Sequence, residues 1–250
     1  MKSIYSFTVE LTKEVEEKTK EKRTNKETGK EEEVEVSKKV KKKTPHKIVV
    51  KEPSRRQLEE ADMEYSIEIS RCIKKGILTK AMLAKKYSDT GGILTEKDAL
   101  RLVDLYSELS ELELQMSKRG ASPNAKQEDP KEKKLGGKVA MARREIVNLE
   151  SAYQSLFNHT ADIKAQNRVI LWYILHLAYL NTDTKEDTHT PLFEGRDFES
   201  RIDDYYKKDE DDHELFRLVQ SKLAALISYW YFSEKPTQED FDNIINDLDS

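Results

Sequence analysis

The side chains that could act as bases or metal ligands are scattered along the chain and form no known motif. The histidines are His46, His159, His176, His189 and His213. The sequence contains no Gly-rich phosphate loop, no G-x-S-x-G turn and no H-E-x-x-H helix. We therefore expect no catalytic residues, no cofactor, no cofactor-binding residues and no metal ligands, and we expect that the protein is not an enzyme.

An acidic run before a predicted helix comes closest to a metal-binding pattern. Asp209–Asp212 directly precede His213 and Glu214, but the run lacks the alternating ligands and central glycine of a calcium loop. Carboxylates at this position favour the positive end of a helix dipole. We interpret the run as a solvated acidic face that caps the following helix.

Two other reactive side chains are expected to be structural. Cys72 has no neighbouring histidine that would indicate a nucleophile, so we expect it to act as a small buried hydrophobe. His176 lies inside the apolar run 169–180, which predicts a core histidine with its hydrogen bonds satisfied. A single cysteine excludes an internal disulfide and fits a reducing compartment.

A basic segment extends from Arg71 to Lys86 without an acidic residue. Together with Thr95–Ala99 it is similar to a helix-turn-helix, in which a basic helix would contact phosphates. However, the intervening connection is too long for that motif, and the helix that would read the bases is acidic. Our first interpretation is a basic face that meets an acidic partner surface through Lys80, Lys85 and Lys86. A nucleic-acid-binding regulator using segment 71–86 is the alternative, although we expect nucleic acid not to be the partner.

The composition predicts that part of the chain lies outside any core. Hydrophobic residues make up 36% and charged residues 37% of the 250 residues, with a formal net charge of −4. The longest apolar run, 169–180, would span about 18 Å as a helix, whereas a bilayer core needs about 30 Å. We expect no membrane span, and the N-terminus lacks the apolar run of a signal peptide. These features predict a cytoplasmic protein.

Residues 4–50 have the pattern of two long strands joined by a turn. Tyr5, Phe7, Val9 and Leu11 alternate with polar residues, which is typical of a half-buried strand. A turn signal at Asn25–Gly29 separates this strand from a second one, in which the valines occupy alternate positions and so share one face. The sequence therefore predicts a charged β-hairpin arm over residues 1–52. A disordered charged arm over residues 16–38 is the alternative.

Opposite charges on the two strands indicate how they pair. A register with Val15 opposite Val40 also matches three acidic positions with three basic ones, although it places Lys13 opposite Lys42. A register shifted by two residues pairs opposite charges as well and keeps every residue on the same face. The positions expected to take part in partner binding are Glu14, Glu16, Glu17, Lys38, Lys39 and Lys41.

The rest of the chain has helical periodicity. Heptad-spaced apolar residues occur in two stretches: Leu102, Leu105, Leu109, Leu112 and Met116, then Val139, Ala142, Ile146, Leu149, Tyr153 and Leu156. This spacing predicts helices that pack along their length, as an antiparallel hairpin or as an intermolecular coiled coil through Leu109 and Leu149. One helix could continue from 138 to 180, with a break near 158–160 as the competing interpretation.

These patterns predict a mainly α protein, a helical bundle or coiled-coil-like helical hairpin with a long N-terminal antiparallel β-hairpin. We divide it into the arm at 1–52, a helical segment at 53–118, a flexible linker at 119–137 and a helical bundle segment at 138–250. Capping boxes are expected at Ser54–Gln57 and Thr95–Asp98, and amphipathic helices follow residue 212 and residue 237.

Residues 53–92 resemble proteins of tailed bacteriophages. The resemblance is carried by Pro53–Asp62, Lys75–Tyr87 and the glycine pair Gly91-Gly92. It implies a virion component or a tail or baseplate assembly factor, and it assigns no residue a role. It also implies a location in the host cell cytoplasm or in the virion.

We therefore expect a non-enzymatic structural or assembly protein that acts, chaperone-like, through protein–protein contacts. A charged strand pair could add to the edge of a partner sheet, and the heptad helices could pack against another chain. The expected partners are other structural or assembly proteins, with a homo-oligomer as a further possibility.

Overall fold

The computed structural model describes residues 2–24, 31–120, 130–181 and 189–249, and their side chains except at 13–42, 119–120 and 130–133. The chain forms two compact units, the first from Met1–Leu58 with Ile170–Ser250 and the second from Glu59–Val169. This division differs from the four predicted segments. The reason is that the N-terminal hairpin packs against C-terminal helices, so that the two ends of the chain share one unit.

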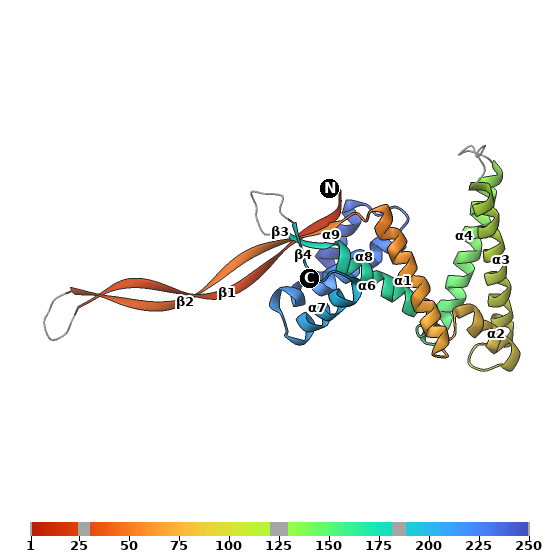
Figure 1. Cartoon of the computed structure of the whole chain (residues 1–250), viewed down its shortest axis with the longest axis horizontal. Coiled ribbons are helices and arrows are strands. Elements are labelled where there is room, and N and C mark those ends of the chain that lie inside the picture. The colour runs from red at the N-terminus through yellow and green to blue at the C-terminus, as the bar shows by residue number, and fades with distance from the viewer. Residues whose placement is uncertain (1, 25–30, 121–129, 182–188, 250) are drawn as a thin grey trace. The chain divides into compact units, whose positions relative to one another are not determined.

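The predicted hairpin is confirmed, with β1 at Ser3–Thr24 and β2 at Glu31–Lys51 running antiparallel (Figure 1). Its register is the first of the two predicted, with Val15 opposite Val40 and Lys13 opposite Lys42. The register also places Glu14 opposite Lys41, Glu16 opposite Lys39 and Glu17 opposite Lys38. The turn signal at Asn25–Gly29 lies outside the described residues.

Two short strands extend the hairpin into a sheet of order β1-β2-β3-β4. They are β3 at Ala178–Asn181 and β4 at His189–Pro191. β3 pairs with Lys47–Val50 of β2. The prediction that a helix extends to residue 180 is therefore wrong at its C-terminal end, because Tyr179 and Leu180 belong to a strand and pair with Val49 and Ile48. An apolar run has no periodicity that separates a buried helix from a buried strand.

The helices of the first unit cover the base of the hairpin. They are α6 at Ala161–Leu177, which begins in the second unit, α7 at Phe198–Glu210, α8 at Glu214–Phe232 and α9 at Gln238–Asp249. Phe7, Val9 and Leu11 are buried on β1, as is Ile48 on β2. Burial of such side chains provides roughly 1.5–3 kcal/mol each. The buried stripe of α8 comprises Leu215, Phe216, Val219, Lys222, Leu223, Leu226 and Ile227.

The second unit contains α1 at Arg55–Lys74, which begins in the first unit, α2 at Lys80–Thr90, α3 at Glu96–Gly120, α4 at Pro130–Ala152 and α5 at Gln154–Phe157. The predicted capping box at Ser54–Gln57 is complete, and at Thr95–Asp98 the structure shows the half in which the threonine side chain accepts. The Gln57 backbone N–H donates to Ser54 Oγ at 3.3 Å, and the Gln57 side chain accepts from the Ser54 N–H at 2.9 Å. Asp98 N–H likewise donates to Thr95 Oγ1 at 3.2 Å.

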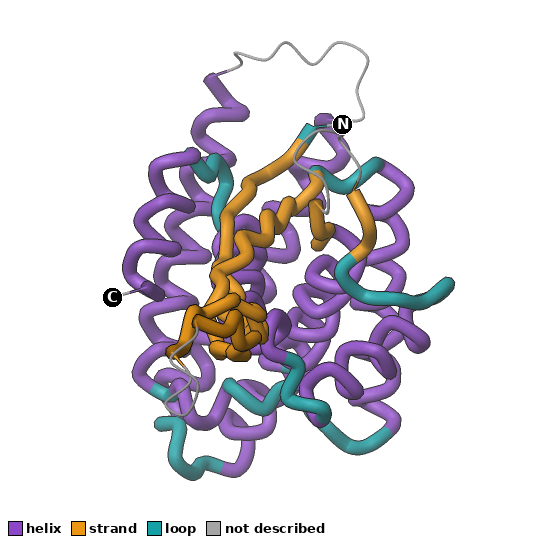
Figure 2. The backbone as a smooth tube through the Cα atoms, turned by 90° about the vertical axis from the view of Figure 1, so that its left-hand side faces the viewer, coloured by secondary structure: helices purple, strands orange, loops and turns teal. Residues whose placement is uncertain are grey.

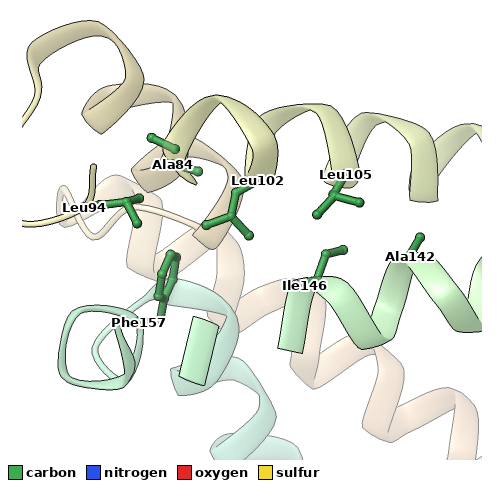
Figure 3. Close-up of a cluster of buried hydrophobic side chains, with 8 residues drawn as sticks. Ala84, Leu94, Leu102, Leu105, Ala142, Ile146 and Phe157 are labelled. Carbon is green, nitrogen blue, oxygen red and sulfur yellow. The ribbon is translucent and has the colours of Figure 1, made fainter. Parts of the chain in front are cut away.

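Helices α3 and α4 run antiparallel and pack on each other. Leu102 and Leu105 of α3 share a buried cluster with Ala142 and Ile146 of α4 and with Phe157 (Figure 3). Leu109 and Leu149 are partly buried against this cluster. Farther along the pair, Leu112, Leu135 and Val139 form a second cluster.

The predicted linker at 119–137 is too long, because α3 continues to Gly120 and α4 begins at Pro130. Proline suits the first turn of a helix. Gly136 and Gly137 each cost a helix about 1 kcal/mol, which the burial of Leu135 and Val139 offsets. Residues 121–129 of the predicted linker lie outside the described part of the chain.

The stretch 138–180 is interrupted, as the competing interpretation predicted. Thr160 forms the break: its N–H donates to the Phe157 carbonyl at 3.1 Å and its hydroxyl donates to the same oxygen at 2.8 Å. A second irregularity at Tyr153 separates α4 from α5. The heptad phase therefore continues in sequence across residues that do not form one helix.

Candidate interaction surfaces

The arm of the hairpin, defined as residues 13–24 and 31–42, is the most distinctive surface of the first unit. Throughout this arm, the described residues show β1 paired with β2 and neither strand paired with a third. Twelve residues of strand extend about 40 Å. The ribbon continues past the helices of its own unit (Figure 1) and is seen nearly end-on, in orange, in Figure 2. Both outer edges therefore present unpaired backbone donors and acceptors.

The register brings together the six charged residues that the sequence predicted for partner binding. Glu14, Glu16 and Glu17 are acidic positions of β1 that lie opposite lysine positions of β2. Cross-strand pairs of opposite charge contribute roughly 0.2–1 kcal/mol each. These pairs agree with the observed register, and they leave the outer edges of both strands available.

The base of the hairpin is tied to α9, which holds the arm on its unit. The Tyr5 ring lies 5.3 Å from the Phe241 ring, and the Tyr5 hydroxyl donates to Asp242. Gln238 Nε2 donates to the Ile4 carbonyl at 2.9 Å. Burial, reinforced by the carboxylate of Asp242, raises the pKa of Tyr5 to about 12. No local pattern indicates this contact, because the partners are 237 residues apart.

A buried lysine on α8 adds a second link within this unit. Lys222 Nζ lies 2.5 Å from Asp249 Oδ1 and 6.0 Å from the centre of the Phe7 ring. Its stem can pack among apolar side chains while its ammonium reaches the carboxylate. The lysine therefore connects α8, the end of α9 and the base of β1.

Lys80, predicted as part of a basic docking face, is directed into the second unit. Its Nζ lies 2.5 Å from Glu150 Oε2, and its backbone N–H donates to Asp162 Oδ2 at 2.6 Å. The Tyr106 hydroxyl donates to the other Glu150 oxygen at 2.6 Å. Burial, together with Glu150, raises the pKa of Tyr106. Lys80 thus holds α2 against α4 and offers little charge to a partner.

Lys85 and Lys86 differ from Lys80 in that both side chains are exposed. Lys85 Nζ lies 2.9 Å from Asp89 Oδ1, one helical turn farther along α2. The ion pairs of Lys80 and Lys85 reduce the positive charge that this helix can present to phosphates. The geometry does not group the three predicted lysines into one basic surface.

Leu109 and Leu149, predicted as partner-contacting positions, face the α3–α4 packing of their own chain. Charged pairs flank this packing: Arg101 donates to both oxygens of Glu145 at 2.6 and 2.7 Å, and Arg143 donates to Glu113 at 2.9 Å. A groove of about 580 Å³ lies along this pair and includes Leu149 and the exposed Leu100.

One face of α1 carries exposed apolar residues that the sequence did not single out for binding. Met63 and Ile67 are 63% and 52% exposed, and a shallow groove of about 670 Å³ continues from them to Arg71 and Lys74. The sequence left Met63 and Tyr65 as alternatives for the buried side of this helix. Tyr65 is the less exposed of the two.

His176 and Cys72 each make contacts inside their own unit. His176 Nδ1 is 2.8 Å from the Trp172 carbonyl, and its ring stacks on the Trp172 ring at 4.0 Å. Cys72 is buried, and this burial, with Glu68 nearby, raises the pKa of its thiol. A thiol with a raised pKa is a poor nucleophile at neutral pH. A pocket of about 260 Å³ next to His176 also includes Lys2, Lys51 and Ser54.

Among the described residues, no three His, Cys, Asp or Glu side chains lie close enough to hold a metal ion. None of the helices in the described ranges has the length and apolarity needed to cross a membrane. Comparisons with models of protein families, with curated proteins and with solved structures find no match to this chain.

Proposed function

We propose that this chain is a non-enzymatic structural or assembly protein that acts through protein–protein contacts, with the arm as its docking element. The observation that carries the proposal is the arm itself, whose two strands pair with each other and with no further strand in the described residues. An isolated two-stranded ribbon is at best marginally stable in water. A long, regular ribbon is therefore best explained by a partner that orders it.

The chemistry of the arm suits strand addition. An outer edge supplies backbone hydrogen bonds to an incoming strand, and alternate side chains supply specificity. The many charged residues along both strands limit unspecific pairing with other sheets. The arm can therefore stay soluble alone and still accept a strand whose charges complement its own.

We place this function in the particle of a tailed bacteriophage, or in its assembly in the cytoplasm of the host cell. The support for this placement is the resemblance of residues 53–92 to phage virion and tail or baseplate assembly proteins. A chaperone-like role and a permanent place in the particle both agree with a docking arm. Co-sedimentation with finished particles, as opposed to assembly intermediates, would distinguish them.

The register of the hairpin permits a clean deletion of the arm. Thr12 and Lys43 are opposite each other, so a two-residue Asn-Gly turn can join them in place of residues 13–42. The buried residues Phe7, Val9 and Leu11 stay in place. The full chain and the shortened chain, each with the same affinity tag, would then be purified from cells that contain the natural partners.

The full chain is expected to retain other assembly proteins in fixed ratios, measured by quantitative mass spectrometry, and the shortened chain to lose them. A matched control keeps the arm and changes the exposed Lys235, in the loop after α8, to glutamate, which should leave binding unchanged. Equal recovery of the same partners with the shortened chain would show that the arm is not the docking element.

A further inference from the structure

The arm segment of β2, with Lys43 added, has a sequence that complements its own reverse. Residues 31–43 read Glu-Glu-Glu-Val-Glu-Val-Ser-Lys-Lys-Val-Lys-Lys-Lys. When a second copy is laid antiparallel to the first, with Ser37 opposite Ser37, every glutamate meets a lysine. The resulting positions are Glu31 with Lys43, Glu32 with Lys42, Glu33 with Lys41, Val34 with Val40, Glu35 with Lys39 and Val36 with Lys38.

The outer edge of this segment is open to a second strand. Its inner edge pairs with β1, whereas β3 pairs with β2 only from Lys47 to Val50. Pro45 lies between the two parts of β2 and has no backbone N–H to donate. The self-complementary segment therefore coincides with the part of β2 whose outer edge has no partner strand among the described residues.

We propose that two copies of this chain join through the outer edges of β2, related by a two-fold axis at Ser37. This pairing makes a four-stranded antiparallel sheet of order β1-β2-β2-β1. The proposal rests on the proposed function, since it names a second copy of the chain as one partner of the docking arm. A two-fold axis between directly opposite residues is a normal feature of antiparallel pairs, and such contacts are self-complementary.

The hairpin alone does not account for this pattern. Pairing within one chain requires only that β1 complement β2, and a uniformly acidic strand opposite a uniformly basic strand would achieve that. Instead the charge reverses halfway along each strand: β2 is acidic at Glu31–Glu35 and basic at Lys38–Lys43. Only this reversal allows β2 to complement a copy of itself.

The outer edge of β1 is a poorer match for its own copy. An antiparallel pairing of two β1 strands centred on Glu17 places Glu17 opposite Glu17 of the copy. A pairing centred on Lys18 places Lys18 opposite Lys18, and it also places Lys13 opposite Arg23. The pairing of β2 centred on Ser37 produces no like-charge pair. In this pairing, valine positions lie opposite even-numbered positions of the other copy, so the valines of both copies share one face of the four-stranded sheet.

A cysteine at the axis tests the register directly. Ser37→Cys in the full chain should form a disulfide-linked dimer under mild oxidation, seen on a non-reducing gel, because residue 37 is opposite its own copy. Thr44→Cys should not, since residue 44 is opposite residue 30. The natural Cys72 is buried, so the unmodified chain serves as the background control. Crosslinking by Glu17→Cys but not by Ser37→Cys would overturn the proposal in favour of the β1 edge.

A pair of charge-swapped chains tests the complementarity. The first carries E31K, E32K, E33K and E35K with K20E, K22E and R23E, and the second carries K38E, K39E, K41E and K42E with E14K, E16K and E17K. Each keeps opposite charges within its own hairpin, but its β2 edge now repels a copy of itself. Circular dichroism spectra equal to that of the unchanged chain confirm folding.

Light scattering should give the mass of two chains for the unchanged protein and of one chain for each swapped variant, with two chains restored on mixing the variants. Added salt should weaken the dimer, because exposed charges are screened. A one-chain mass for the unchanged protein, or a two-chain mass for both variants alone, would contradict the proposal. If the unchanged protein is a single chain and the arm deletion still loses other partners, this inference fails while the proposed function stands.

Discussion

At the scale of single residues, Glu150 joins three elements of the second unit. Its carboxylate accepts hydrogen bonds from Lys80 Nζ of α2 and from the Tyr106 hydroxyl of α3, and it belongs to α4. Only 14% of its side chain is exposed. Charge-assisted hydrogen bonds in a shielded setting are stronger than those at the surface. The basic segment therefore includes a lysine whose role is to hold its own fold.

Replacing Glu150 by glutamine should destabilise the protein by about 1–3 kcal/mol, because the Lys80 ammonium loses its carboxylate in a partly buried site. Urea denaturation followed by circular dichroism measures this change. Glu113→Gln is the matched control, since it breaks the exposed ion pair with Arg143, for which less than about 1 kcal/mol is expected. Equal effects of the two substitutions would argue against a special role for Glu150.

The raised pKa of Tyr5 makes the stability of the folded protein depend on pH above pH 10. Its pKa in the folded protein is raised to about 12 from 10.0, so between these values the unfolded chain releases a proton that the folded chain retains. Stability from this group is complete below pH 10 and is lost as the pH rises toward 12. Denaturation midpoints should therefore fall more steeply above pH 10 for the unchanged protein than for Tyr5→Phe. Parallel pH profiles would show that Tyr5 is not responsible.

At the scale of elements, the α3–α4 pair follows from its apolar spacing. Leu105 is fully buried between the helices, whereas Leu109 and Leu149 lie at the margin of the same cluster. Leu109→Asp and Leu149→Asp should each lower the melting temperature, because each places a carboxylate against apolar side chains. Met141 of α4 is 74% exposed, so Met141→Asp should leave the melting curve nearly unchanged. A melting curve for Leu109→Asp that matched the control would refute the pairing.

Some elements could be predicted from local pattern and others could not. The hairpin was predictable because opposite charges occupy matching positions of its two strands, although two registers fitted them. The helix starts at Ser54 and Thr95 were predictable because their caps are local. β3 was missed because Tyr179 and Leu180 become a strand only through β2, which is distant in sequence. The linker at 119–137 was too long because burial of Leu135, a tertiary effect, outweighs the two glycines.

Only some of the residues predicted for partner binding could be placed from local pattern. The charged positions of the arm depend on spacing along two strands, so the sequence predicted their pairing. The direction of Lys80 depends on Glu150 and Asp162, which are 70 and 82 residues away. No local pattern distinguishes such a lysine from the exposed Lys86. The exposed face of α1 was likewise undecided, because Met63 and Tyr65 fit the helical period about equally well.

At the scale of the whole molecule, each of the two units contains its own buried residues. The first unit buries Ile48, Phe193, Leu223 and Ile227 almost fully, and the second does the same for Leu94 and Leu102. Among the side chains that the structure describes, those that fix the hairpin to its unit precede residue 13 or follow residue 42. Folding and partner binding should therefore be separable.

Thermal unfolding of the chain with residues 13–42 replaced by Asn-Gly tests this separation most directly. If the arm exists to bind a partner, the shortened chain should keep its helical circular dichroism signal and melt at the same temperature as a monomeric form of the full chain, within a few degrees. A shortened chain that unfolds, or that melts far below the full chain, would contradict the account by showing that the arm is part of the folded core.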